Sequence, residues 1–249
     1  MTKPPDALPT KIAQSLLQRI ISAEFPPGTL LPSERELQDE YHVSRTVVRE
    51  AIKLLTSRKL LNSVRGQGTV VATNITEPVM DALLLAFYQS QIRREDIFKV
   101  RLVLEPESAA MAAQNATIPQ IRRISEIAQS FVRLSPDGDE VAKRDYLTQW
   151  GKLDREFHQL LAEASQNAVF GILITVIIGI VWNAISVKVP RPTAEQFAIS
   201  VRQHEAIALA VAAHDTDAAR RMMIEHIETS LQNVITPEDR MQLQVESLI

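Results

Sequence analysis

Apolar residues recur every three to four positions along most of this chain, the spacing that predicts amphipathic helices. The first apolar stripe runs through Lys11–Ala23 and is broken by Phe25–Gly28, where two prolines precede a glycine. Ser33 and Glu36 follow with the three-residue spacing of a capping box, so a second, short helix is predicted to end near Tyr41.

Two short strands are predicted after a third helix, which is expected at Ser44–Leu55 with the serine as its cap. Leu60–Val64 and Thr69–Ala72 have the residue types of strands, and the glycines of Arg65–Gly68 between them predict a hairpin. Three helices and a hairpin in about 70 residues make a winged helix-turn-helix, which we assign to residues 1–73.

The rest of the chain shows helical periodicity and no alternation typical of a half-buried strand. The polar stretch 74–79 is interpreted as a linker, 80–236 as an all-α helical bundle, and 237–249 as a weakly patterned tail in which one further helix is left open. The whole protein is thus predicted to be mainly α. The expected helices lie at about residues 78–90, 94–115 (with a kink at Pro106), 118–134, 139–165, 168–187, 194–213 and 216–234.

Composition places the chain among ordinary globular proteins, with 45% hydrophobic and 23% charged residues. It contains no cysteine, which excludes disulfides, iron–sulfur clusters and thiolate zinc sites. The apolar run Ala168–Trp182 is shorter than the roughly 20 residues of a membrane span and favours a buried helix. The beginning of the chain has no signal-peptide pattern, so a cytoplasmic protein without a membrane partner is expected.

The formal net charge of −3 is unevenly distributed along the chain. Residues 1–73 hold 10 Lys and Arg against 7 Asp and Glu, a net charge of +3, and the remainder carries −6. A basic N-terminal segment on an acidic bulk favours contact between that segment and a polyanion.

The predicted third helix has the donors that a helix in the major groove of DNA needs. Arg45, Thr46 and Arg49 face solvent in its first two turns, and a good bidentate arginine–guanine pair contributes roughly 1–3 kcal/mol of discrimination. Arg35 begins the preceding helix, and Gly66 at the tip of the wing permits close approach to a phosphate. The alternative is that these arginines form an ordinary solvated face.

Three segments in this order resemble the N-terminal domain of GntR-family bacterial transcription regulators. They are PPGTLLPSEREL at 26–37, VSRTVVREAIKLL at 43–55 and RGQGTVV at 65–71. The resemblance implies a homodimer that binds double-stranded DNA at a pseudo-palindromic operator. It also implies DNA contacts from Arg35, Ser44, Arg45, Thr46, Arg49, Gly66 and Gln67.

One aspartate and three histidines are candidate metal ligands in the helical region. Asp154 and His158 are four residues apart on one predicted helix, so they project from the same face. His204 and His226 each lie 11 residues from Asp215, and in an antiparallel hairpin that turns there they are level, about 16 Å from the turn. Such a set suits Zn, Ni, Mn or Fe(II) and leaves positions for a small anion. Taken singly, each histidine is more often an ordinary core or surface residue.

The second half of the chain resembles the FCD ligand-binding domain of FadR-type GntR regulators. The matching pieces are Arg101–Pro106, Ala109–Ala113, Asp154–His158, His204–Ile207 and Ala218–Ile227. The resemblance implies a bundle of six or seven helices that holds a divalent metal, zinc foremost, through Asp154, His158, His204 and His226.

The same resemblance implies a small carboxylate effector that binds at this metal. Arg101 would clamp the carboxylate as a bidentate donor, and Asn183 would line the cavity. Each has an alternative: Arg101 is equally placed for a structural salt bridge to Glu105, and the Asn183 amide for a hydrogen bond to a neighbouring backbone group. The apolar character of 168–187 is compatible with a greasier ligand or a dimer interface.

These features together favour a metabolite-responsive transcription regulator, expected to be a repressor whose operator affinity depends on the effector. The alternative is a metal-dependent hydrolase or lyase built on the aspartate and three histidines, with Glu156 or Glu205 as general base. Neither glutamate has a recognised catalytic spacing, and an enzyme gives no reason for the basic N-terminal segment. A third interpretation keeps the regulator and makes the metal purely structural.

Overall fold

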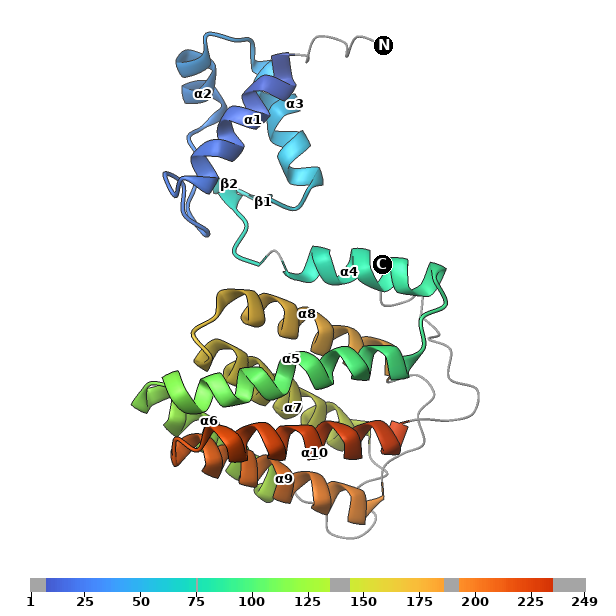
Figure 1. Ribbon diagram of the computed structural model, residues 1–249. Coiled ribbons are helices and arrows are strands. Elements are labelled where there is room, and N and C mark those ends of the chain that lie inside the picture. The colour runs from blue at the N-terminus through green and yellow to red at the C-terminus, as the bar shows by residue number, and fades with distance from the viewer. Residues whose placement is uncertain (1–7, 75, 135–143, 186–192, 235–249) are drawn as a thin grey trace. The chain divides into compact units, whose positions relative to one another are not determined.

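A computed structural model of the chain describes residues 8–74, 76–134, 144–185 and 193–234. Within these ranges the chain forms ten helices and one two-stranded sheet (Figure 1). The predicted mainly α fold is therefore confirmed. The chain divides into two compact units, Met1–Pro78 and Val79–Ile249. The predicted tail at 237–249, with the helix left open there, lies outside the described residues.

The N-terminal unit is a winged helix-turn-helix, as predicted. Its apolar core joins all of its layers, because Leu16, Leu37, Leu55 and Leu61 from four different elements are almost completely buried together. The elements are α1 (Leu8–Ile21), α2 (Glu34–Tyr41), α3 (Arg45–Ser57), β1 (Leu61–Val64) and β2 (Gly68–Val71).

Local hydrogen bonds fix the start of the two helices of the helix-turn-helix. The backbone N–H of Ser33 donates to Glu36 Oε2 at 2.7 Å, and the N–H of Glu36 donates to Ser33 Oγ at 3.2 Å, so the predicted capping box is present at α2. Ser44 occupies the cap position of α3, but its side chain makes no capping hydrogen bond there. The expected serine cap is therefore wrong in its hydrogen bond, and the hydroxyl lies exposed.

The wing is an antiparallel pair in which Leu61 faces Val71 and Val64 faces Gly68. Leu30 adds a further bridge to Val70. At the turn, Gly66 has φ +80°, a left-handed conformation that costs a glycine little and other residues more. The hairpin predicted from the glycine-containing turn is thus formed.

The second unit is a bundle of helices. They are α4 (Thr76–Gln89), α5 (Arg94–Asn115), α6 (Ile118–Arg133), α7 (Arg144–Ala164), α8 (Ala168–Ile185), α9 (Ala194–Ala212) and α10 (Thr216–Val234). The first of them begins inside the segment interpreted as a linker, because Asn74 Oδ1 accepts a hydrogen bond from the backbone N–H of Thr76 at 3.0 Å. Residues 139–143 and 186–187, expected to be helical, lie outside the described residues.

The helices α9 and α10 form the antiparallel hairpin that the sequence predicts, with its turn at 213–215 (Figure 1). His214 takes a left-handed conformation at this turn, and its Nδ1 lies 2.8 Å from the carbonyl oxygen of Ala113. Asp215 Oδ1 accepts a hydrogen bond from the N–H of Ala218 at 2.8 Å and so caps α10. His214 is thus a structural residue.

Two long helices of the bundle, α5 and α8, differ in composition, and only α8 is predominantly apolar. Pro106 lies inside α5, and the helix continues through it from Arg94 to Asn115. The apolar α8 packs against α4, where Met80 lies so close to Gly179 that a Cβ there would collide with it. None of the helices in the described part of the chain has the length and apolarity needed to cross a membrane.

Candidate metal centre and nucleic-acid interface

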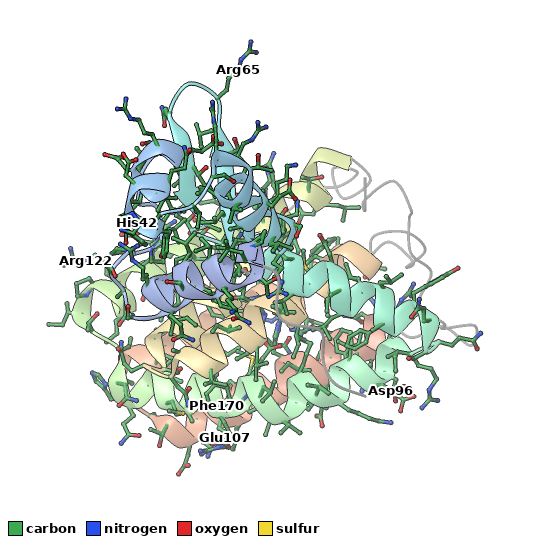
Figure 2. All side chains as sticks on the ribbon, turned by 90° about the horizontal axis from the view of Figure 1, so that it is seen from above. His42, Arg65, Asp96, Glu107, Arg122 and Phe170 are labelled. Atoms are coloured by element: carbon green, nitrogen blue, oxygen red, sulfur yellow. The ribbon has the colours of Figure 1, made fainter. Side chains whose placement is uncertain are left out.

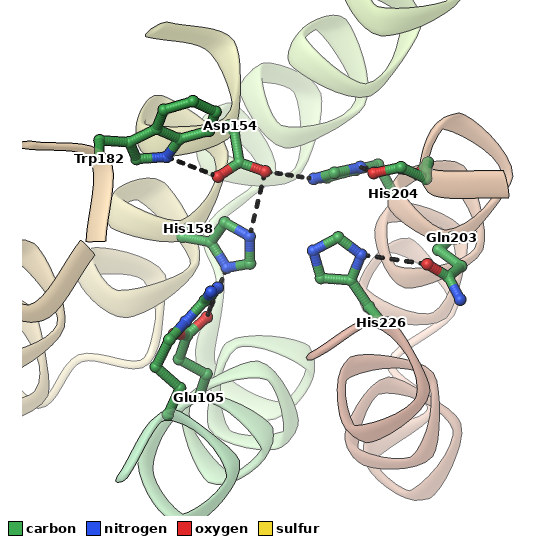
Figure 3. A network of polar contacts seen from close by, with 9 residues as sticks. Glu105, Asp154, His158, Trp182, Gln203, His204 and His226 are labelled. Carbon is green, nitrogen blue, oxygen red and sulfur yellow. Dashed lines mark hydrogen bonds and ion pairs between the residues drawn. The ribbon is translucent and has the colours of Figure 1, made fainter. Parts of the chain in front are cut away.

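Asp154, His158, His204 and His226 converge in the interior of the helical unit. One ligand atom from each lies within 4.8 Å of the ligand atoms of the other three, and all four residues are buried. The first two come from one face of α7, and the other two stand level on α9 and α10 (Figure 3). The spacing arguments made from the sequence therefore place these side chains together, as the structure finds them.

Each of the three imidazoles has its Nδ1 close to an oxygen atom. His204 Nδ1 lies 2.7 Å from the backbone carbonyl oxygen of Ser200, and His226 Nδ1 lies 3.3 Å from Oε1 of Gln203. His158 Nδ1 lies 2.6 Å from Oε2 of Glu105. In a neutral imidazole, an acceptor beside Nδ1 favours the proton on that nitrogen and leaves Nε2 with its lone pair.

The Nε2 atoms of His158 and His204 are directed toward Asp154, whose Oδ1 lies 3.7 Å from the first and 3.3 Å from the second. Both nitrogens are buried, and neither has a hydrogen-bond partner in the described part of the chain. A buried polar atom without such a partner is costly, and a metal ion supplies the missing interaction. The chemistry of three imidazoles and one carboxylate therefore fits a divalent ion.

Asp154 is held from its other side by an aromatic residue. The indole Nε1–H of Trp182 donates to Asp154 Oδ2 at 2.9 Å (Figure 3). Gly151 makes room for this ring, because a Cβ at that position would lie 2.8 Å from two carbons of the indole. Oδ2 is thus engaged by the protein while Oδ1 faces the histidines.

Arg101 forms the buried salt bridge that was one of its two predicted alternatives. Its Nε donates to Glu105 Oε1 at 2.6 Å, and the two side chains are only 4% and 2% exposed. Since Glu105 also contacts His158, a chain of three residues connects the guanidinium to the candidate metal ligands. Arg101 additionally lines the cavity described below, so its contact with an effector stays a prediction.

The charges around His158 shift the titration of the cluster. Burial alone lowers the pKa of this imidazole, but the carboxylates of Glu105 and Asp154 overcome that effect and raise it to about 9. Burial raises the pKa of Glu105, yet Arg101 and His158 bring it down to about 2. Burial, together with the neighbouring histidines, holds the pKa of His226 well below its usual range.

A cavity of about 120 Å³ opens beside Asp154. Arg101 and Asp154 are the charged residues of its described lining. The rest of this lining consists of two kinds of side chain, aromatic or apolar at Phe98, Trp150, Val181, Trp182 and Phe197, and polar at Gln196, Ser200, Gln203, Thr229, Ser230 and Asn233. Asn183, predicted to line the cavity, belongs to α8, but its side chain lies outside the described part.

Sequence reasoning missed the residues that support the candidate ligands. Glu105 was considered only as a partner of Arg101, and Trp182 and Gln203 were not considered at all. Gln203 had a detectable signal, since it precedes His204 and lies level with the turn of helix that carries His226. The contact of Trp182 depends on how α7 packs against α8, for which the sequence pattern contains no signal.

The two glutamates considered as general bases do not line the cavity. Glu156 pairs with Arg123 of α6, where both side chains are about half exposed. Glu205 follows His204 by one residue and is partly buried on α9. The structure therefore places neither where a general base is needed.

The residues expected to contact DNA are exposed in the N-terminal unit. Arg45 and Arg49 of α3 have side chains that are 70% and 58% exposed. Both approach one carboxylate at the start of α2: Arg45 Nε lies 2.8 Å from Glu34 Oε2, and Arg49 Nε lies 3.8 Å from Glu34 Oε1. The other expected contacts are exposed as well, namely Arg35, Ser44, Thr46, Gly66 and Gln67.

The wing presents a further cation. Arg65 extends from the turn of the hairpin into solvent (Figure 2). The neighbouring Gly66 has open space where a side chain would be, so its backbone is accessible to a phosphate. Recognition helix and wing together form the candidate nucleic-acid interface.

Comparison with known families decides between the interpretations. The family described as "Bacterial regulatory proteins, gntR family" matches residues 8–71, and the "FCD domain" matches 96–229, more than half of the chain. This protein belongs to the FCD-domain GntR regulators. It is therefore a DNA-binding transcription regulator and not the hydrolase or lyase considered as the alternative.

Individual relatives of this FCD-domain GntR regulator are regulators as well. It is 30% identical to the uncharacterized HTH-type transcriptional regulator YieP of Escherichia coli K12 over 160 residues, which cover 63% of this chain and 66% of that protein. It is 27% identical to the Glc operon transcriptional activator of the same organism, with 90% of this chain and 87% of that protein covered. The structure of Streptococcus agalactiae GntR shares the fold, with a TM-score of 0.67, 24% identity, and coverage of 90% and 99% of the two chains.

Proposed function

We propose that this FCD-domain GntR regulator binds its operator as a homodimer and changes its affinity when a small carboxylate binds at a divalent metal. The observation that carries this proposal is the buried convergence of three imidazoles and one carboxylate beside a cavity lined by an arginine. The metal ligands would be Asp154, His158, His204 and His226, and zinc fits best, with nickel, manganese and iron(II) as further candidates.

The metal, when bound, would supply open coordination positions for a carboxylate oxygen. Residues of the chain itself orient the ligands and line the cavity. Glu105, Ser200 and Gln203 hold the three imidazoles in orientation, and Trp182 holds Asp154. Arg101 lines the cavity and presents a guanidinium to an anionic ligand, while its Nε stays paired with Glu105.

A residue of the cavity lining packs in the same apolar cluster as α4, the first helix of the second unit. Val181 lines the cavity and belongs to an apolar cluster with Leu84 of α4 and Ile97 of α5. An occupant that prefers one packing of this cluster shifts the balance between two arrangements by its difference in affinity, typically about 1–3 kcal/mol. That corresponds to a change of about 5–150-fold in operator affinity.

The metal is tested by elemental analysis of the purified full-length protein. We expect one divalent ion per chain in the wild type and a large loss in His204→Ala, because this imidazole is one of four ligands. The control is His42→Asn, which changes an exposed histidine at the end of α2 and keeps a residue that tolerates its left-handed conformation. Equal metal content in wild type and His204→Ala would remove His204 from the site.

DNA binding is tested by a gel-shift titration with the regulator's own upstream region. Arg45→Ala and Arg49→Ala should each weaken the specific complex by roughly 1–3 kcal/mol and leave thermal stability unchanged, since both side chains are exposed. Arg122→Ala removes the same charge from an exposed site on α6 and serves as control. Unchanged affinity in both α3 variants would exclude α3 as the recognition helix.

We propose that the regulator represses transcription. Because the Glc operon relative is an activator, a reporter experiment has to distinguish repression from activation. A reporter behind the upstream region should be more active in cells that lack the regulator. A reporter that loses activity in those cells would show activation instead. Neither outcome alters the test of the metal or of the recognition helix.

A further inference from the structure

Two polar stripes extend from the histidines along the hairpin of α9 and α10. On α9, Ser200 and Gln196 precede His204 by four and eight residues. On α10, Ser230 and Asn233 follow His226 by four and seven residues. All four of these non-histidine residues line the cavity beside Asp154.

The antiparallel arrangement brings the two stripes into register. Because the histidines are level, the two serines lie on a common level about 6 Å from them, at a rise of about 1.5 Å per residue. Gln196 and Asn233 lie about 10–12 Å from the histidines by the same measure. They are joined by a hydrogen bond of 2.8 Å from Gln196 Nε2 to Asn233 Oδ1, which closes the far end of the stripes.

The level of the serines offers polar atoms to a ligand. The side chain of Ser230 makes no hydrogen bond within the described part of the chain, and Ser200 Oγ has only a long contact of 3.4 Å with His204 Nδ1. Both hydroxyls belong to the cavity wall. A ligand with a hydroxyl at this level gains hydrogen bonds to both, whereas an apolar end leaves them unpaired.

Part of the cavity lining is apolar. Phe98, Trp150, Val181 and Phe197 form it, and the ring pair of Trp150 and Phe197 lies edge to face with centroids 4.6 Å apart. Such a wall suits the C–H groups of a short carbon chain whose hydroxyls point to the serines. The cavity thus offers a ligand both apolar and polar side chains.

The described lining of the cavity contains few charges. Among the described lining residues, Arg101 and Asp154 are the only charged ones, and the arginine is already paired with Glu105. A second carboxylate at the level of the serines would lose its hydration without gaining a cation, which is costly. The polar stripes are therefore suited to hydroxyls and not to a second anionic group.

From these observations we infer that the effector is a short hydroxy monocarboxylate of three or four carbons with a hydroxyl at the end distant from the carboxylate. The inference rests on the proposed function, since it assumes that the carboxylate binds at the metal. The length of the effector follows from bond lengths of about 1.5 Å, which put a terminal hydroxyl about 4–5 Å from the carboxylate of a three-carbon acid. Its size agrees with the cavity of about 120 Å³, since an engineered cavity of about 150 Å³ holds benzene.

Calorimetric titration of the metal-loaded full-length protein tests the inference with matched acids. We expect 3-hydroxypropionate to bind at least about tenfold more tightly than propionate. Propionate lacks the hydroxyl that would bond to Ser200 and Ser230, and the loss of such hydrogen bonds typically weakens binding by about tenfold. We also expect 4-hydroxybutyrate to bind more tightly than succinate. Metal content is measured after each titration, so that removal of the metal by an acid is recognised.

The variant Ser230→Ala should abolish most of the preference for 3-hydroxypropionate over propionate. The matched control is Ser125→Ala on α6, whose hydroxyl bonds to the carbonyl of Ile121 away from the cavity, and there the preference should persist. Equal affinities of the hydroxylated and unhydroxylated acids, tighter binding of succinate, or an unchanged preference in Ser230→Ala would overturn the inference while the proposed function stands. Absence of binding by all four acids, with the metal in place, would overturn both.

Discussion

Glu105 is the residue whose replacement is expected to have the largest effect on the helical unit. It lies 2.6 Å from Arg101 Nε and 2.6 Å from His158 Nδ1, and both neighbours are as buried as Glu105 itself. The variant Glu105→Gln keeps the shape of the side chain and removes the charge. The guanidinium of Arg101 stays buried and loses the carboxylate with which it is paired, which typically costs about 3–5 kcal/mol.

A second variant separates the charge effect from lost packing. Arg101→Met removes the partner cation, and in the double variant Arg101→Met/Glu105→Gln no uncompensated charge remains between the two positions. The double variant should therefore be more stable than the sum of the two single losses predicts. A coupling free energy of about 1–3 kcal/mol is expected for neighbours in one network.

Urea unfolding followed by tryptophan fluorescence measures these losses in the full chain. The protein has two tryptophans, Trp150 on α7 and Trp182 on α8, so the signal reports on the helical unit alone. Metal-free protein is used, because a metal that binds the folded state would add its own stabilisation. Additive losses in the double variant, or a loss below about 1 kcal/mol in Glu105→Gln, would refute the buried ion pair.

Three further predictions follow from contacts described above. Gly151→Ala should displace the indole of Trp182 and weaken metal binding by about 10–100-fold, measured by competition with a chromogenic chelator; unchanged affinity would show that the indole does not support Asp154. Ser33→Ala should destabilise the N-terminal unit by about 0.5–2 kcal/mol, measured by hydrogen exchange of α2, with Ser57→Ala at the C-terminal end of α3 as control. Prolonged dialysis against EDTA should lower the unfolding temperature of the helical unit and leave the protection of α2 unchanged; an equal loss in both units would argue against a metal confined to the helical unit.

The elements of both units were predictable because their signals are local. The capping box at Ser33 and the glycines of the wing act within a few residues, and the structure shows both. The level pairing of His204 with His226 was also predictable, since it needs only one hairpin and a constant rise per residue. Short-range sequence signals and the geometry of one helical hairpin were enough to predict the capping box, the wing and the position of His204 beside His226.

The support of the candidate ligands was not predictable, because it depends on the packing of helices distant in sequence. The contact of Glu105 with His158 requires α5 beside α7, and that of Trp182 with Asp154 requires α8 beside α7. Arg101 illustrates the difficulty, since the same position allows a salt bridge and an effector contact, and the structure shows that it pairs with Glu105 and lines the cavity at once. The start of α4 was placed too late because the side chain of Asn74 caps it from within a segment of linker composition.

The three imidazoles are oriented by oxygen atoms that belong to the protein itself, from a carboxylate, a backbone carbonyl and an amide. Their rotation is therefore restricted as soon as the bundle has folded, and the proposed ion would meet side chains that are already aligned. The entropy of ordering them would be lost during folding and not during binding of that ion. On the proposed function, a regulator that loses its ion would stay folded and could be loaded again without first having to refold.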